Sequence, residues 1–63
     1  MNNVGYRIKE IRKEIGLTQD QLSSLSGVSR SHLAEIESGK YSPTIKTLEA
    51  IAAACGKPAK DFV

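Results

Sequence analysis

Apolar residues recur along the first part of the chain with helical spacing. Four aliphatic residues follow one another at intervals of four, three and four: Val4, Ile8, Ile11 and Ile15. This spacing places them on one face of a helix over about residues 5–15, while the positions between them are mostly charged. Gly16 is placed to end this helix, because glycine readily adopts a positive φ, and Leu17 can then fold back onto the apolar face.

A second, shorter helix is predicted over residues 18–25. Thr18 and Gln21 have the spacing of a capping box, in which the threonine hydroxyl accepts a hydrogen bond from the Gln21 backbone N–H and the Gln21 side chain reaches back. Leu22 and Leu25 give this helix an apolar edge over only about two turns. It is therefore too short to be stable without neighbours.

A glycine-containing turn separates this helix from a third. Gly27 can adopt the left-handed backbone conformation, and Val28 after it is placed to enter the core. Ser29 is typical of an N-cap and predicts a helix over residues 30–38. Two residues of that helix are expected to face inward: Leu33 and Ile36.

The fourth predicted helix is the most hydrophobic. It begins either with Ser42 as its cap and Pro43 as its first residue, or with Thr44 as its cap. A broad apolar stripe through an alanine-rich sequence indicates a core helix: Ile45, Leu48, Ile51, Ala52 and Cys55. Gly56 then ends it.

The last residues predict a single helical turn, with Pro58 in its first position and Phe62 buried. The chain shows no strand pattern, no repeat and no low-complexity tract. Residues 1–63 therefore predict one all-α domain.

Composition narrows the functions that are compatible with this domain. The 63 residues carry 9 Lys and Arg against 7 Asp and Glu, a formal charge of +2. Cys55 is the only cysteine and His32 the only histidine, so we expect neither a disulfide nor a metal site, and no cofactor. Without a long apolar stretch or a secretory leader, we expect a cytoplasmic protein with no membrane association.

The sequence offers no catalytic arrangement. Although serines are frequent, none is paired with a base, because His32 is one residue from Ser31 and points in another direction on a helix. We therefore expect a protein without enzymatic activity.

Two short helices joined by a glycine-containing turn are the ingredients of a helix-turn-helix, whose second helix enters the major groove of DNA. The inward residues leave a polar, donor-rich surface on the other side: Gln19, Arg30, Ser31, Ala34 and Glu35. This surface predicts binding to double-stranded DNA.

Several motifs occur together at fixed spacing: Gly16-Leu17-Thr18-Gln19 followed by Leu22, Gly27-Val28-Ser29-Arg30-Ser31, Ile36-Glu37-Ser38-Gly39-Lys40, and Ser42-Pro43-Thr44. In this combination the chain resembles the Cro/phage-repressor (xenobiotic-response-element type) helix-turn-helix family over about residues 5–62. The resemblance implies a compact five-helix, lambda-repressor-like DNA-binding domain whose helix-turn-helix is formed by helices 2 and 3.

The resemblance also implies roles for single residues. Those expected to read base edges are Arg30, Ser31, Ala34 and Glu35. Their chemistry is suitable, since arginine can donate two bonds to guanine, serine bonds to several bases, alanine can touch a thymine methyl and glutamate can accept from cytosine. Glu35 is equally suited to rejecting wrong sequences through its charge.

A second group of residues is implied to contact the DNA phosphates: Thr18, Gln19, Ser29, His32, Lys40, Tyr41 and Ser42. Lys40 is the strongest candidate because of its charge, whereas Tyr41 is equally suited to packing. Asp20 complicates the contact expected of Gln19, because it favours the helix start but repels a phosphate unless it points away.

Other positions bear on assembly. In the family, the positions of Arg12 and Glu37 form a salt bridge that holds the recognition helix; the alternative is that each is a surface charge. Phe62 and Val63 are the apolar candidates for contact between two copies. Four residues depart from the family pattern: Ser23, Leu25, Lys57 and Pro58.

The leading hypothesis is a sequence-specific transcriptional regulator, a repressor, that binds as a homodimer to two-fold-related half-sites about 34 Å apart. Alternatives are an antitoxin or a restriction-modification controller with the same domain, or a protein-interaction module of this fold. The last predicts weak, salt-sensitive DNA binding without a preferred site. A protein partner, such as a toxin or a further domain, stays open.

Overall fold

The computed structural model describes residues 3–63, and these residues form helices connected by short loops without a strand. The elements follow in the order α1 (Val4–Glu14), α2 (Gln19–Ser26), α3 (Arg30–Glu37), α4 (Ile45–Cys55) and η1 (Ala59–Phe62). The all-α class and the predicted helices are therefore confirmed, with ends that differ by a residue or two. The implied count of five helices is not, because the last element is a single 3₁₀ turn that follows four α-helices.

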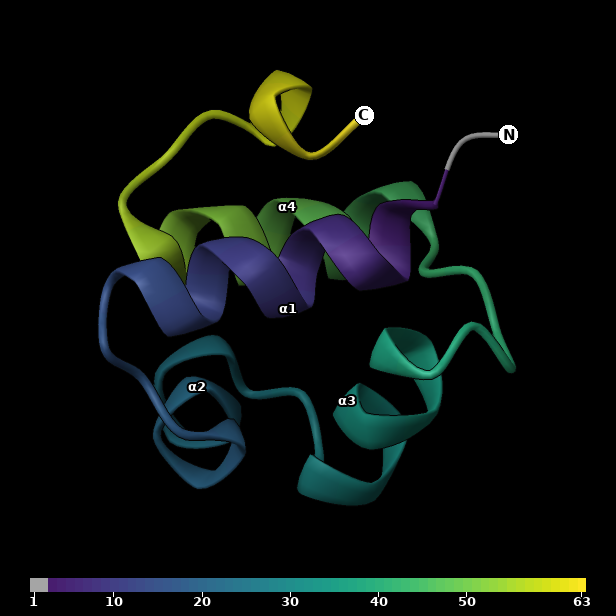
Figure 1. The fold of residues 1–63 in the computed structure, drawn as a ribbon, viewed down its shortest axis with the longest axis horizontal. Helices are drawn as coiled ribbons and strands as arrows, with labels where there is room; N and C mark the ends of the chain where they lie inside the picture. The colour runs from purple at the N-terminus through teal and green to yellow at the C-terminus, as the bar shows by residue number, and fades with distance from the viewer. Residues whose placement is uncertain (1–2) are drawn as a thin grey trace.

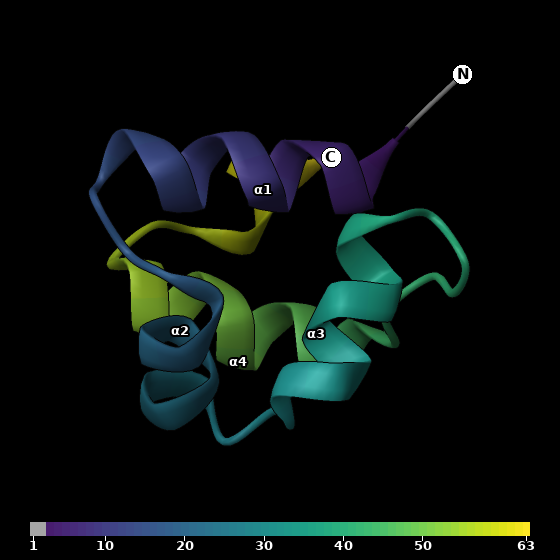
Figure 2. The ribbon, with the colours of Figure 1, turned by 60° about the horizontal axis from the view of Figure 1, so that its bottom comes forward.

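The helices surround one core. α2 and α3 lie below α1 and α4 in Figure 1, and η1 lies on the opposite side of that pair. In the turned view of Figure 2, α2 and α3 stand side by side below α1. α1 packs against α3, and α2 packs against both α3 and α4. The two helices joined by the 27–29 turn therefore have different further neighbours: α4 for α2, and α1 for α3.

Polar side chains cap the start of all four α-helices. At α1, Asn3 Oδ1 accepts from the Tyr6 backbone N–H at 3.0 Å. The predicted capping box of α2 is present: Thr18 Oγ1 accepts from the Gln21 backbone N–H at 3.1 Å, and Gln21 Oε1 accepts from the Thr18 backbone N–H at 2.8 Å. Ser29 Oγ accepts from the His32 backbone N–H at 3.2 Å. At α4 the cap is Thr44, whose Oγ1 accepts from the Thr47 backbone N–H at 3.1 Å, which decides between the two predicted starts.

The turn between α2 and α3 is held by its own side chains. Gly27 adopts a φ of 76°, the left-handed conformation that its sequence position predicts. Ser23 Oγ donates a hydrogen bond of 2.6 Å to the Val28 carbonyl, so the hydroxyl of this residue, which departs from the family pattern, has a partner within the turn. Val28 is half-buried against the core, as predicted.

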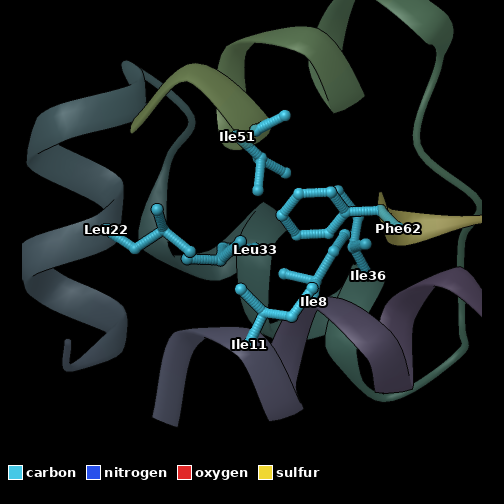
Figure 3. Close-up of a cluster of buried hydrophobic side chains, with 8 residues drawn as sticks. Ile8, Ile11, Leu22, Leu33, Ile36, Ile51 and Phe62 are labelled. Atoms are coloured by element: carbon cyan, nitrogen blue, oxygen red, sulfur yellow. The ribbon is translucent and has the colours of Figure 1, made fainter. Parts of the chain in front are cut away.

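The core draws on every element (Figure 3). Its buried residues are Ile8, Ile11, Leu22, Leu33, Ile36, Ile51, Ala52 and Phe62. Most of these side chains point toward one another from α1, α3, α4 and η1, and Leu22 adds the contribution of α2. α2 contributes a single fully buried side chain, Leu22. Its position therefore also depends on its packing against α3 and α4.

Three predicted core residues lie on the surface instead. Leu25 is 61% exposed, Ile45 is 78% exposed, and Ile15 is also exposed. Each is at an end of its helix, where the chain is already turning away from the core. An i,i+3 or i,i+4 spacing alone does not reveal this.

Phe62 corrects a prediction about assembly. Its side chain is fully buried in the chain's own core, so it is not available for contact with a second copy. Val63 beside it is 69% exposed. Pro58 precedes η1 as its N-cap rather than forming its first residue.

The backbones of α1 and α3 meet at Gly5. A Cβ atom built on Gly5 would overlap the Ile36 carbonyl oxygen. Glycine is therefore required here because the two backbones approach closely. Its φ is that of an ordinary helix, so backbone conformation is not the reason. This contact sets how closely α3 lies against α1.

Candidate nucleic-acid interface

α3 presents its first turn and one side to solvent. Of the residues expected to read bases, Arg30 and Ser31 are exposed, and Ala34 and Glu35 are half-buried one turn later. Those expected to contact phosphates lie around them. Five are exposed at the start of α2 or α3 or in the loop after α3: Thr18, Ser29, Lys40, Tyr41 and Ser42. His32 is exposed on α3, and Gln19 is half-buried on α2.

A buried ion pair fixes α3 from behind. Arg12 of α1 donates from Nε to Glu37 Oε2 at 2.8 Å and from Nη2 to Glu37 Oε1 at 3.0 Å, which is the paired geometry that guanidinium and carboxylate favour. The two side chains are only 9% and 3% exposed. The salt bridge that the resemblance implied between the first and third helices is therefore present, and the surface-charge alternative is wrong.

The same pair also holds α2 and the loop before it. Arg12 Nη1 donates to the Leu17 carbonyl at 2.8 Å. Gln19 Nε2 donates to Glu37 Oε1 at 3.1 Å. Three helices thus meet at one network, and the Gln19 side chain, expected only to reach a phosphate, is a member of it. No spacing in the sequence indicates this contact, because it depends on how α2 and α3 are packed.

A second ion pair crosses the helix-turn-helix on its outer surface. Arg30 Nε, at the start of α3, lies 3.0 Å from Asp20 Oδ1 in the first turn of α2. Both side chains are well exposed, at 65% and 78%. Asp20 therefore points toward α3, which relieves the conflict with a neighbouring phosphate that its sequence position raised. The sequence places both residues at helix starts but gives no sign that they pair.

The Glu35 carboxylate lies close to Lys40 and His32. Lys40 Nζ lies 3.5 Å from Glu35 Oε2, and His32 Nδ1 lies 3.9 Å from Glu35 Oε1. Lys40 Nζ is also 5.6 Å from the centre of the Tyr41 ring, which lies 6.4 Å from that of His32. These contacts connect α3 to the loop that follows it, and the Lys40 charge reduces the field that the Glu35 carboxylate projects outward.

A shallow hollow of about 370 Å³ lies beside the start of α2. Its lining includes Lys13, Thr18, Gln19 and Arg30, together with the acidic Asp20. A helix start directs backbone N–H groups and the positive end of the helix dipole outward, which favours an anion. The hollow thus offers hydrogen-bond donors and cationic side chains to a phosphate group, while the Asp20 carboxylate, paired with Arg30, opposes them.

Other chemistry has little support among residues 3–63. No group of three or more His, Cys, Asp or Glu side chains there is arranged to hold a metal ion. Burial raises the pKa of the Cys55 thiol, Lys57 opposes the rise and Glu37 adds slightly to it, so this thiol is kept protonated. No helix in the described part of the chain is both long and apolar enough to span a membrane.

Comparisons with known proteins agree with this geometry. The model of a family described as helix-turn-helix matches residues 8–62. The immunity repressor protein of Bacillus phage phi105 is 57% identical over 53 residues, which cover 84% of this chain and 37% of the repressor. The chain therefore spans little more than a third of that relative.

Solved structures are similar over nearly the whole chain. The restriction-modification controller protein C.AhdI from Aeromonas hydrophila superimposes with a TM-score of 0.94 and 27% identity, covering 98% of this chain and 94% of the controller. A variant of the controller protein C.Esp1396I gives a TM-score of 0.89 and 34% identity, covering 97% and 79%. This chain belongs to the helix-turn-helix family of DNA-binding transcription regulators.

Proposed function

We propose that this chain is a sequence-specific repressor that inserts α3 into the major groove of an operator. The observation that carries the proposal is the paired α2 and α3, fixed from behind by the Arg12–Glu37 pair while the polar side of α3 faces solvent. An α-helix with its side chains is about 10–12 Å across. The major groove is about 12 Å wide and admits a helix in this way.

Base reading falls to the outer side of α3. Arg30 has the donors for guanine O6 and N7, and Ser31 beside it bonds to several bases. Ala34 and Glu35 lie one turn later, where alanine can touch a thymine methyl and glutamate can accept from cytosine N4. Because the Lys40 ammonium lies near Glu35, the carboxylate is partly neutralised as it approaches the negatively charged duplex.

Phosphate contacts would position α3 without carrying sequence information. The starts of α2 and α3, capped by Thr18 and Ser29, offer backbone N–H donors to the strands on either side of the groove. Gln19 and His32 extend these two regions, and Lys40, Tyr41 and Ser42 form a third in the loop after α3. Lys40 brings the positive charge that such a contact needs.

Two copies on one operator would double the contacted surface. A dimer with two-fold symmetry matches half-sites about 34 Å apart, one turn of the duplex. The exposed Val63 is the side chain that we assign to the contact between copies. The phage repressor among the relatives supports the repressor role, and the two controller proteins support a second candidate, control of restriction-modification genes by the same domain.

Selection of duplexes from a random pool, at about 0.15 M salt, tests the proposal. At that salt the Debye length of about 8 Å suppresses loose electrostatic binding. A two-fold-symmetric enriched motif is expected. No enrichment would contradict the proposal and favour a protein-interaction module.

Two variants then separate the two kinds of contact on the selected duplex. Arg30→Ala is expected to weaken binding by about 1–3 kcal/mol and to relax the preference at one base position. Lys40→Ala is expected to weaken binding to all sequences and to lower the salt slope by about one unit. An equal loss by Arg30→Ala on selected and random duplexes would contradict base reading by this residue.

A further inference from the structure

We infer that Asp20 is a positioning residue for DNA recognition: it holds the Arg30 side chain in the orientation that reads a guanine, and thereby sets selectivity at one base pair. The inference rests on the proposed function, and it assigns to a carboxylate on α2 a role in reading DNA by α3.

The atoms that form the Asp20–Arg30 pair determine which N–H donors of Arg30 are left to bind DNA. Asp20 Oδ1 lies 3.0 Å from Nε of Arg30, which is the inner nitrogen of the guanidinium. The two outer nitrogens, Nη1 and Nη2, carry the other four N–H donors of the group. Those outer donors can form the two parallel bonds to guanine O6 and N7. The contact with Asp20 thus uses the edge of the guanidinium that base reading does not need.

The two residues are also well placed to restrain one another. Asp20 is in the first turn of α2, whose start is fixed by the Thr18–Gln21 capping box. Arg30 is the first residue of α3, and Ser29 before it is the N-cap. Both backbones are therefore anchored on opposite sides of the turn, and the ion pair restricts the long arginine side chain between them.

Such a restraint matters for selectivity more than for stability. An exposed ion pair contributes little to folding, because water and salt screen it. An arginine that is already oriented loses less conformational freedom when it binds. The benefit is confined to duplexes that have a guanine where the restrained guanidinium points, whereas an unrestrained arginine can adapt to other bases.

A simpler role for Asp20 makes a different prediction. If its charge only repelled phosphates, removing that charge would strengthen binding to every duplex by the same factor. If Asp20 positions Arg30, removing it would change the ratio between duplexes that differ at one base pair. The two roles are therefore distinguished by a ratio of affinities rather than by any single affinity.

The test uses the duplex selected by the wild-type chain, together with a set in which each base pair is changed in turn. The loss of preference in Arg30→Ala identifies the base pair that Arg30 reads. Asp20→Asn, which keeps the size of the side chain and removes its charge, is then measured on the same set. Glu49→Gln is the matched control, because it removes an exposed carboxylate from α4 and leaves the Asp20–Arg30 pair intact.

We expect Asp20→Asn to reduce discrimination at the Arg30 base pair by about three- to tenfold, the range that corresponds to fixing one long side chain. Discrimination at the other positions should be unchanged. In an Arg30→Ala background, Asp20→Asn should have no further effect on this ratio, because the side chain through which it acts is absent. Asp20→Glu should recover part of the discrimination, since it keeps the charge.

Three results would overturn the inference while leaving the proposed function intact. The first is an Asp20→Asn chain that discriminates at the Arg30 base pair as well as wild type does. The second is a uniform rise in its affinity for all duplexes, and the third is an equal loss of discrimination in Glu49→Gln. A wild-type chain that enriches no motif is a different result. It would contradict the proposed function, and the inference with it.

Discussion

The two ion pairs of the helix-turn-helix have the same chemistry and opposite surroundings. Arg12 and Glu37 join α1 to α3 inside the molecule, with two short hydrogen bonds and almost no exposed surface. Asp20 and Arg30 join α2 to α3 on the outside, with most of both side chains in solvent. The first pair holds α3 in place, whereas the second orients the Arg30 side chain on α3.

Burial decides which of these roles a pair can have. Charges removed from water need a well-formed partner, so loss of one member leaves the other strongly destabilising. An exposed pair is screened, and each member is well solvated without the other. Stability should therefore depend on the inner pair, and DNA selectivity on the outer one. Four substitutions follow in order of expected effect on unfolding: the first and last act on the two pairs, and the two between them act on a backbone contact and a helix cap for comparison.

The largest effect is expected from Glu37→Gln. It leaves Arg12 charged and buried without its carboxylate, so the free energy of unfolding should fall by about 3–5 kcal/mol. A chain of this size has a total of roughly 3–9 kcal/mol, so the loss removes about half of its stability and the variant should unfold at a much lower urea concentration. Urea denaturation followed by circular dichroism measures the change.

The matched control for Glu37→Gln removes both charges. Arg12→Met combined with Glu37→Leu should recover most of the loss, because no unpaired charge remains in the interior. If Glu37→Gln lost less than about 1 kcal/mol, the inner pair would be behaving as an exposed one.

The next effect is expected from Gly5→Ala, which acts on the same α1–α3 contact without any charge. The added methyl overlaps the Ile36 carbonyl oxygen, so α1 must move away from α3. Overpacking of this kind costs about 1–3 kcal/mol. Thermal unfolding compares it with Lys9→Ala, at an exposed position of α1. A Gly5→Ala chain as stable as the control would show that the two helices can separate freely.

A smaller loss is expected from Ser29→Ala. Ser29 is exposed, but its hydroxyl accepts a bond from the His32 backbone N–H that would otherwise lack a partner in the helix. Removing such a cap costs about 1 kcal/mol. Urea denaturation measures the loss, with Ser24→Ala on the exposed side of α2 as the control. No difference between the two variants would contradict the role of this cap.

The smallest effect on stability is expected from Asp20→Asn. The outer pair is screened, so its loss should change the free energy of unfolding by no more than about 1 kcal/mol. Urea denaturation at low and high salt checks this, because any contribution of the pair should shrink as salt is added. A loss as large as that of Glu37→Gln would remove the distinction between the two pairs.

Much of the fold is predictable because its signals are local. The Thr18–Gln21 box, the Ser29 cap and the Gly27 turn each depend on a few consecutive residues, and each is present in the structure. The inward positions of α1 and α3 also follow from helical spacing. These patterns can be recognised without knowing any tertiary contact.

Exposure at helix ends is not predictable in the same way. Leu25 and Ile45 have the spacing of core residues, but each lies beyond the stretch of its helix that faces the other elements. Phe62 was expected to bury and also to contact a second copy, and only the packing of η1 decides between the two. These outcomes depend on where neighbouring helices end.

The residues of the candidate interface were predictable, but most of the contacts among them were not. Arg30 and Asp20 are recognisable as helix-start residues, yet their pairing requires the geometry of the α2–α3 turn. Gln19 is recognisable as a polar residue on the outer surface, yet its bond to Glu37 depends on how three helices meet. The Arg12–Glu37 pair was expected only from the resemblance, because 25 residues separate its members.

One measurement tests the division of roles most directly. Nuclear magnetic resonance resolves the Nε–H group of each arginine, so Arg12 and Arg30 can be observed together while the selected duplex is added. The Arg30 resonance is predicted to shift as its guanidinium meets the bases, and the Arg12 resonance to stay in place. A shift of Arg12 with none at Arg30 would contradict the assignment of the outer pair to DNA and of the inner pair to the fold.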